Sequence, residues 1–198
     1  MKLPQLILLR LGFLTFFIPC PTLAVSDVVF YGEPYAGIAY NSVHASYGVS
    51  SIKDPTYKGA GLTAGMNLGW HSDYVHLLIG GGLDHIFYDP SFRGGLWNLG
   101  VGIGWEWNIP LMTTIFIRNS NFYGASDESF SNSNFNSIEL GFSYFFSEEL
   151  KANFSYSSFD QSVSSVGVKS DLFRLSMSFP FAIDYPNEWW RLRRRLGD

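Results

Sequence analysis

The sequence predicts an all-β fold, an eight-stranded antiparallel transmembrane β-barrel. Three observations predict it. Apolar residues alternate with small or polar residues in eight segments, which is the period of a β-strand with two different faces. Aromatic residues make up 18% of the chain and charged residues only 15%, an excess typical of the aromatic girdles of lipid-facing barrels. After Tyr35, no apolar run approaches the about 18 residues of a membrane-spanning helix.

The N-terminal segment, 1–24, has the pattern of a secretory signal peptide. Basic residues precede an apolar run from Leu11 to Ile18, and the segment ends on the small residue Ala24. The alternative is an uncleaved anchor helix, but Arg10 leaves an apolar run shorter than the about 20 residues that a span requires. We therefore expect cleavage near Ala24, which would remove Cys20, the single cysteine of the chain, and leave no disulfide or thiolate site.

The first four strands are predicted over 35–42, 59–71, 74–85 and 96–107. The last of these alternates most clearly: large apolar residues share one side, and small or acidic residues share the other. Its apolar side, which we assign to lipid, includes Leu99, Val101, Ile103, Trp105 and Trp107. Its other side consists of Asn98, Gly100, Gly102, Gly104 and Glu106.

The next four strands are predicted over 113–120, 137–146, 150–157 and 172–181. The alternation in 113–120 is ambiguous, and we choose the register that keeps Arg118 away from lipid, so that Ile115 and Ile117 face outward. In 137–146 the outward residues include Phe142. All eight segments have about the length that a tilted membrane-spanning strand needs.

The predicted connections alternate in length along the chain. Short ones lie near Ser72, Asn108 and Ser147, whereas longer ones lie at 44–58, 121–134 and 159–169, with an intermediate one at 89–95. Short periplasmic turns and long outer loops are the expected asymmetry of outer-membrane barrels. The domain prediction is therefore a barrel over 25–181, followed by a periplasmic tail over 182–198.

The composition of the second face decides which side is inside. A soluble sheet would expose a face rich in Lys, Glu and Thr, whereas here that face is mostly Gly, Ser and Asn, which suits the narrow interior of an eight-stranded barrel. Every charge within the predicted strands falls on this inner face. The members are Asp84, Glu106, Arg118, Glu139, Lys151 and Arg174. Because enclosed charges need partners, we expect a salt-bridged network that fills the interior, with a water-filled pore as the alternative.

Several stretches resemble the OmpA-like, OmpX-like and opacity-protein group of small outer-membrane barrels. They are the Tyr35-Ala36-Gly37 entry, the strand through 61–65 and the last strand, which ends at Phe181. The stretch 88–159 also resembles the YfaZ family of uncharacterised outer-membrane proteins. The resemblance implies a bacterial outer-membrane location, contact with outer-membrane lipid and lipopolysaccharide, and insertion by the barrel-assembly machinery through the last strand. The length of the outer loops and the lack of a catalytic constellation in the sequence favour a structural, envelope-integrity or adhesion-like role, in which the loops meet an extracellular ligand.

The stretch from Arg118 to Asn121 resembles the His-x-Ser-Asn stretch of outer-membrane lipid A deacylases, which are also eight-stranded barrels. The resemblance puts Ser120 at the position of the nucleophile, which needs a neighbouring base. Arg118 stands where the resemblance calls for histidine, and a guanidinium group stays protonated. We therefore expect no catalysis; a deacylase-like esterase and a narrow channel remain the alternative functions.

His71 and His76 flank the first predicted short turn. Two histidines could bind a metal ion, but the sequence places no carboxylate beside them, so we expect ordinary polar lining, no metal and no cofactor. The net charge of −4 and the lack of a basic patch in the barrel segment argue against a nucleic-acid partner. The tail, with Trp189, Trp190 and four arginines, is expected either to lie on the periplasmic leaflet or to remain solvated.

Overall fold

The computed structural model describes residues 29–46, 56–72, 74–89, 92–123, 134–147, 149–163 and 166–182. The predicted signal peptide, 1–24, lies outside the described residues, and so does the predicted tail after Ala182. Among the described residues, no helix has the length and apolar character needed to cross a membrane.

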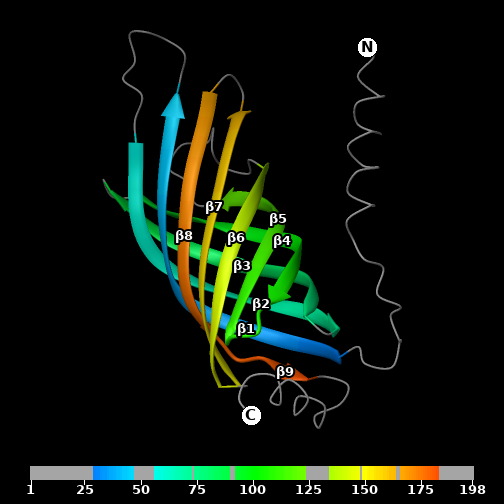
Figure 1. Cartoon of the computed structure of the whole chain (residues 1–198). Coiled ribbons are helices and arrows are strands. Elements are labelled where there is room, and N and C mark those ends of the chain that lie inside the picture. Colours follow the sequence, from blue (N-terminus) through cyan, green and yellow to red (C-terminus); the bar gives the residue numbers. More distant parts are fainter. Residues whose placement is uncertain are drawn as a thin grey trace, which may run out of the picture.

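Eight long antiparallel strands form one closed sheet (Figure 1). They are β1 (Val29–Ser46), β2 (Thr56–Ser72), β3 (Val75–Asp89), β4 (Phe92–Glu106), β5 (Leu111–Tyr123), β6 (Asn134–Ser147), β7 (Leu150–Val163) and β8 (Val166–Ser178). Each strand pairs with the next, and β1 pairs with both β2 and β8, which closes the barrel. The predicted fold class is confirmed.

The strand β1 begins six residues before its predicted start at Tyr35 and completes the seam of the barrel. Its first part pairs with the two-residue strand β9 (Phe181–Ala182), in which Ala182 lies opposite Tyr31. Pro180 separates β9 from β8 because proline has no backbone N–H for the ladder. The backbone N–H of Phe179 still donates to the carbonyl oxygen of Pro34, at 3.0 Å, so the seam continues past the interruption.

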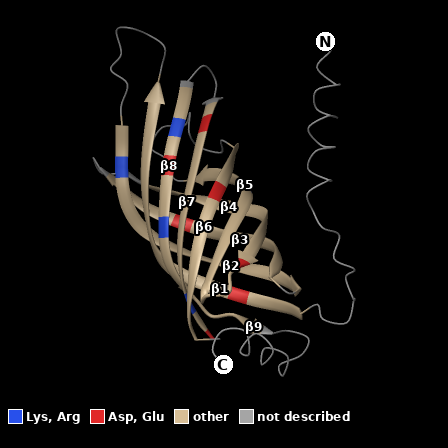
Figure 2. Cartoon of the chain, in the orientation of Figure 1, with Lys and Arg blue, Asp and Glu red and all other residues tan. Residues whose placement is uncertain are grey.

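The two faces of each strand differ sharply in exposure. On β6, Ile138 is 63% exposed, whereas the next residue, Glu139, is 4% exposed. The outward residues of β4 that we assigned to lipid are all about half exposed: Leu99, Val101, Ile103, Trp105 and Trp107. Phe142 on β6 and both Ile115 and Ile117 on β5 also point outward, so the register chosen around Arg118 is the one the structure has. Charged residues appear as a few separate bands on an otherwise uncharged ribbon (Figure 2).

Glycines on the inner face make room for tyrosine rings that cross the interior. A Cβ on Gly69 would overlap the ring of Tyr31, and a Cβ on Gly65 or Gly82 would overlap the ring or hydroxyl of Tyr35. A larger residue at these positions would have to displace an aromatic side chain that the interior holds in place. Glycine at these three positions is therefore a packing requirement of the two tyrosines.

The polarity of the two faces reverses at the end of the barrel opposite the short turns. There, buried residues of seven strands form an apolar core inside the barrel. The core consists of Ala39, Val43, Ala45, Ile86, Tyr88, Leu96, Phe122, Phe135, Phe159, Val168 and Leu172. At the same height the outward positions are polar, with Asn134, Asn136, Asp160 and Lys169 exposed. At this end the barrel is apolar inside and polar outside, as a water-soluble barrel is. The apolar outer surface, which we assign to lipid, begins nearer the short turns.

Two of the predicted loops are wrong because of this reversal. The strands β7 and β8 continue through 159–169, where Asp160 pairs with Lys169, so that only residues 164–165 lie between the two strands. In the same way β3 extends to Asp89 and β4 begins at Phe92, with Tyr88 paired to Phe92. Phe159 and Val168 face inward, and the charged residues Asp160 and Lys169 face outward, which is the opposite of the pattern in the membrane-facing segments.

A matched pair of substitutions on β6 tests the position of the lipid boundary. Leu140→Arg places a charge in the apolar surface and should cost about 2 to 4 kcal/mol of barrel stability, whereas Asn136→Arg, four residues earlier on the same face, should cost about 0 to 1 kcal/mol. Urea unfolding of both variants in lipid vesicles, followed by tryptophan fluorescence, measures the difference. Equal destabilisation by the two substitutions would contradict the assigned boundary.

Candidate functional site: the charged interior

The centre of the barrel holds a buried pair between β8 and β3. Arg174 donates two hydrogen bonds to Asp84, from Nε to Oδ1 at 2.9 Å and from Nη2 to Oδ2 at 2.8 Å. Asp84 is fully buried and Arg174 is 7% exposed. The two parallel bonds form the bidentate geometry in which a guanidinium group and a carboxylate interact most strongly.

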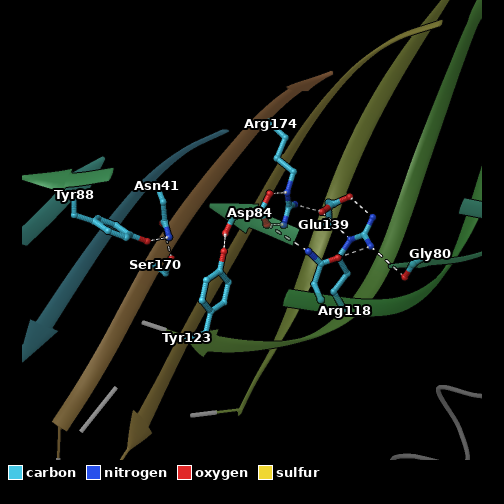
Figure 3. Close-up of polar contacts among 10 residues, drawn as sticks. Asn41, Gly80, Asp84, Tyr88, Arg118, Tyr123, Glu139, Ser170 and Arg174 are labelled. Atoms are coloured by element: carbon cyan, nitrogen blue, oxygen red, sulfur yellow. Dashed lines mark hydrogen bonds and ion pairs between the residues drawn. The ribbon is translucent and has the colours of Figure 1, made fainter. Parts of the chain in front are cut away.

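Glu139 on β6 lies between two arginines (Figure 3). Arg118 on β5 donates to it from Nε at 2.8 Å and from Nη2 at 2.9 Å, and Arg174 donates from Nη1 to the same carboxylate. Asn98 on β4 completes the cluster, because it donates to Asp84 and accepts a bond of 3.0 Å from Arg118. The result is a neutral network across the interior. It consists of two cations and two anions from four strands, and one amide from a fifth strand.

A second, smaller ion pair lies nearer the short turns. Lys151 on β7 donates to Glu33 on β1 at 2.7 Å, and the hydroxyl of Ser178 donates to the other oxygen of Glu33 at 2.6 Å. Sequence reasoning missed Glu33, because it precedes the predicted start of β1 and is followed by Pro34. The signal that could have found it is the alternation itself, since Glu33 continues the inward series of Tyr35, Gly37 and Ala39.

The interior is nearly filled between these layers. A cavity of about 50 Å³ remains, lined by residues that include Glu33, Tyr35, Arg118, Glu139 and Arg174. This volume holds a few water molecules at most. The lumen around the charges is therefore a packed interior, and its polar groups bind mainly to one another.

Aromatic packing closes the interior on the loop side of the charges. The rings of Phe135 and Phe159 stack with centroids 4.5 Å apart, and Phe122 packs edge-on against Phe135 at 5.2 Å. In the same region the amide of Asn41 donates to the hydroxyl of Tyr88, and Ser170 donates to Asn41, both at 2.8 Å (Figure 3). The loop end is thus an apolar plug with its few polar groups paired.

A third polar group lies at the short-turn end, away from the central network. His71 on β2, His76 on β3 and Glu106 on β4 are all buried and face one another. The Nε2 atoms of the two histidines lie 3.5 and 3.6 Å from Oε2 of Glu106. The Nδ1 atom of His76 is 2.8 Å from the hydroxyl oxygen of Tyr31.

The six charged residues that we predicted on the inner face thus fall into three separate clusters. Asp84, Arg118, Glu139 and Arg174 meet in the central network. Lys151 instead binds Glu33, and Glu106 instead lies beside the two histidines. Which charges meet depends on the stagger between strands around the barrel, and a single sequence does not reveal it.

The geometry around Ser120 does not resemble an esterase centre. Ser120 is 5% exposed and faces the interior, away from the lipid surface where an acyl chain would lie. Arg118, which stands where the resemblance calls for histidine, forms an ion pair with Glu139. Glu139 itself pairs with Phe116, four residues and thus about 14 Å along the strand from Ser120.

The chain is similar to solved structures of small outer-membrane β-barrels. Neisserial surface protein A is 19% identical, with a TM-score of 0.47, over 78% of this chain and 99% of that chain. The attachment invasion locus protein Ail of Yersinia pestis is 10% identical, with a TM-score of 0.48, over 76% and 99%. OprG from Pseudomonas aeruginosa is 13% identical, with a TM-score of 0.43, over 78% and 97%. No protein-family model and no curated protein sequence matches the chain.

Substitution of Arg174 tests the energetic role of the central network. Arg174→Met removes the cation from Asp84 and one of the two from Glu139, and breaking a buried pair in this way should cost about 3 to 5 kcal/mol. Lys169→Met, five residues earlier on the same strand but exposed, should change stability by at most about 0.5 kcal/mol. Urea midpoints of the two variants in lipid vesicles provide the measurement, and similar midpoints would show that the network contributes little.

Proposed function

We propose that this chain is a sealed, non-catalytic outer-membrane β-barrel with an envelope-structural or surface-interaction role. The observation that carries the proposal is the filled interior, with the charge network at its centre and the apolar plug on its loop side. A barrel closed in this way presents only its outer surface and its ends to other molecules. Under this proposal the apolar surface contacts outer-membrane lipid and lipopolysaccharide, and the loop end meets partners outside the cell.

The height of the apolar surface supports the membrane assignment. On β6 the outward apolar residues run from Ile138 to Phe146, and along β8 and into β9 they run from Phe173 to Phe181, a length of nine residues in each case. A tilted strand needs about 9 to 11 residues to cross the hydrocarbon layer. Water would otherwise cover this large apolar surface at a high cost in free energy.

The polar rim above the apolar surface supports an interaction role for the loop end. From Ile138 to Asn134, β6 extends by about 14 Å beyond the apolar surface, and its outward residues there are asparagines. Asn119 on β5 donates hydrogen bonds to Asn134 and Asn136, so the rim has a fixed arrangement of amides. A rigid polar rim would hold the loops away from the membrane, where a partner can reach them.

The two alternative functions find less support in the interior. A channel needs a continuous lumen, and the cavity beside the central charges has a volume of only about 50 Å³. A deacylase needs a base that activates Ser120, and Arg118 and Glu139 are bound to each other instead. Mass spectrometry of lipid A from cells with and without the gene addresses the second alternative, since loss of an acyl chain that depends on Ser120 would favour it.

Cysteine labelling on intact cells tests the proposed location and orientation. Asn136→Cys at the loop-end rim should react with a membrane-impermeant maleimide on intact cells. Asn108→Cys, exposed at the short-turn end, should react only after the outer membrane is permeabilised. Labelling is read on outer-membrane fractions in which the barrel shows heat-modifiable gel migration. The reverse pattern, or recovery of the chain outside the outer membrane, would contradict the proposal.

Planar-bilayer recording tests whether the interior is sealed. The purified barrel should show no steady ionic conductance, because the charge network and the aromatic plug occupy the lumen. A general porin purified and inserted in the same way is the positive control. Steady single-channel steps from the folded barrel would favour the channel function instead.

A further inference from the structure

The short-turn end of the barrel brings three metal-ligating side chains to one point. His71 and His76 lie directly opposite each other in the register of β2 and β3, and Glu106 is the last residue of β4. All three side chains point inward and are more than nine-tenths buried. One ligand atom from each residue lies within 4.8 Å of the other two.

The separations are longer than those of strong charge-assisted hydrogen bonds and suit a shared ion. The two histidine Nε2 atoms lie 3.5 and 3.6 Å from Oε2 of Glu106, whereas a hydrogen bond between a histidinium and a carboxylate would be about 2.7 to 2.9 Å long. In a tetrahedral site with bonds of about 2.0 to 2.2 Å, neighbouring ligand atoms are about 3.3 to 3.6 Å apart. The two histidine-to-glutamate distances match this spacing, and the third pair of ligand atoms lies within 4.8 Å.

Within the part of the chain that the structure describes, three polar atoms of this cluster are buried without a hydrogen bond. They are Nε2 of His71, Nε2 of His76 and Oε1 of Glu106. Buried polar atoms in native proteins are nearly always paired, and an unpaired buried carboxylate is especially unfavourable. The central network and the Glu33 pair satisfy their ionic groups, so this cluster differs from the rest of the charged interior.

Tyr31 orients one of the histidines for coordination. Its hydroxyl oxygen is 2.8 Å from Nδ1 of His76. In the tautomer with the proton on Nδ1, His76 donates to Tyr31 and directs the lone pair of Nε2 toward Glu106. Metal-binding histidines almost always donate their second ring N–H to such a partner, which fixes the tautomer and the ring orientation.

We propose that His71, His76 and Glu106 bind one divalent transition-metal ion of the Zn²⁺ type at the periplasmic end of the barrel. Two imidazoles and one carboxylate are a typical zinc ligand set, with water in the fourth position. Calcium and magnesium ions prefer all-oxygen sites with more ligands. The ion would join β2, β3 and β4 at the end of the barrel and neutralise the buried carboxylate.

The test uses the full barrel, folded in detergent without a polyhistidine tag. Calorimetric titration with Zn²⁺ should give one ion per barrel. Titration with Co²⁺ should give the visible absorption bands of a low-symmetry, four-coordinate site, which report the geometry directly. Bound Zn²⁺ should also raise the temperature at which the folded band disappears from heat-modifiable gels, because it binds the folded state.

Matched variants locate the ion. Glu106→Gln, which preserves shape, and the double variant His71→Gln, His76→Gln should reduce the stoichiometry from one ion to none. The double variant His44→Gln, His85→Gln changes the other two histidines of the chain and should bind as the parent does. Tyr31→Phe should weaken Zn²⁺ binding by about 10-fold or more. Heat-modifiable migration shows that each variant is folded before it is titrated.

Two results would overturn the proposal. One is a folded parent barrel that binds no Zn²⁺ or Co²⁺. The other is undiminished binding in the folded Glu106→Gln variant, which would place the ion at another site. Because the titration does not depend on where the barrel resides or whether it conducts, its failure would leave the proposed outer-membrane function standing, and the reverse also holds.

Discussion

The position of Glu139 between Arg118 and Arg174 is the interaction on which the rest of the interior depends. A charge that a membrane-spanning strand points at lipid costs about 2 to 4 kcal/mol at the midplane, so the charged side chains at that height face inward. An eight-stranded barrel encloses too little space to hydrate those charges. The free-energy cost of burying these charges is low only when each cation has an anion within hydrogen-bonding distance. The network with Asp84 and Asn98 has this arrangement. The dense packing around the central charges is therefore a consequence of charge pairing in a narrow barrel.

The reversal of polarity along the strands follows from the same constraint. Where lipid covers the outside, polar groups are inside; where water covers the outside, as at Asn136 and Lys169, apolar groups can fill the interior. The stack of Phe135 and Phe159 is possible only because their strands have left the apolar surface at that height. The boundary between the two patterns marks where the hydrocarbon layer ends, and a single strand such as β8 carries both patterns in succession.

The sequence predicts the fold well because a period of two over nine residues is a strong signal. The alternation around Leu99 and Ile103, read with the aromatic content, predicts both the strands and their lipid-facing sides. The prediction fails at 159–169. The alternation continues there, but the face that is apolar elsewhere becomes polar, so the sequence of a strand hairpin resembles that of a polar loop. The prediction also fails at Glu33, because the neighbouring Pro34 argues against a strand in general but is tolerated in β1 next to the gap between the end of β8 and the start of β9.

The candidate sites are harder to predict because they depend on how strands meet, and residues far apart in sequence come together only through the stagger of the barrel. His71 and His76 are five residues apart and flank a turn, so local reasoning finds them. Glu106 is thirty residues away, and its approach requires β4 to end level with the hairpin of β2 and β3. From the sequence alone, Glu106 is one more inward-facing carboxylate that should pair with an arginine. The two arginines of the described interior, however, are already bound to Asp84 and Glu139. A carboxylate that lacks a cation of its own while facing two imidazoles has the chemistry of a ligand, and this contrast with the paired charges distinguishes it from the rest of the lumen.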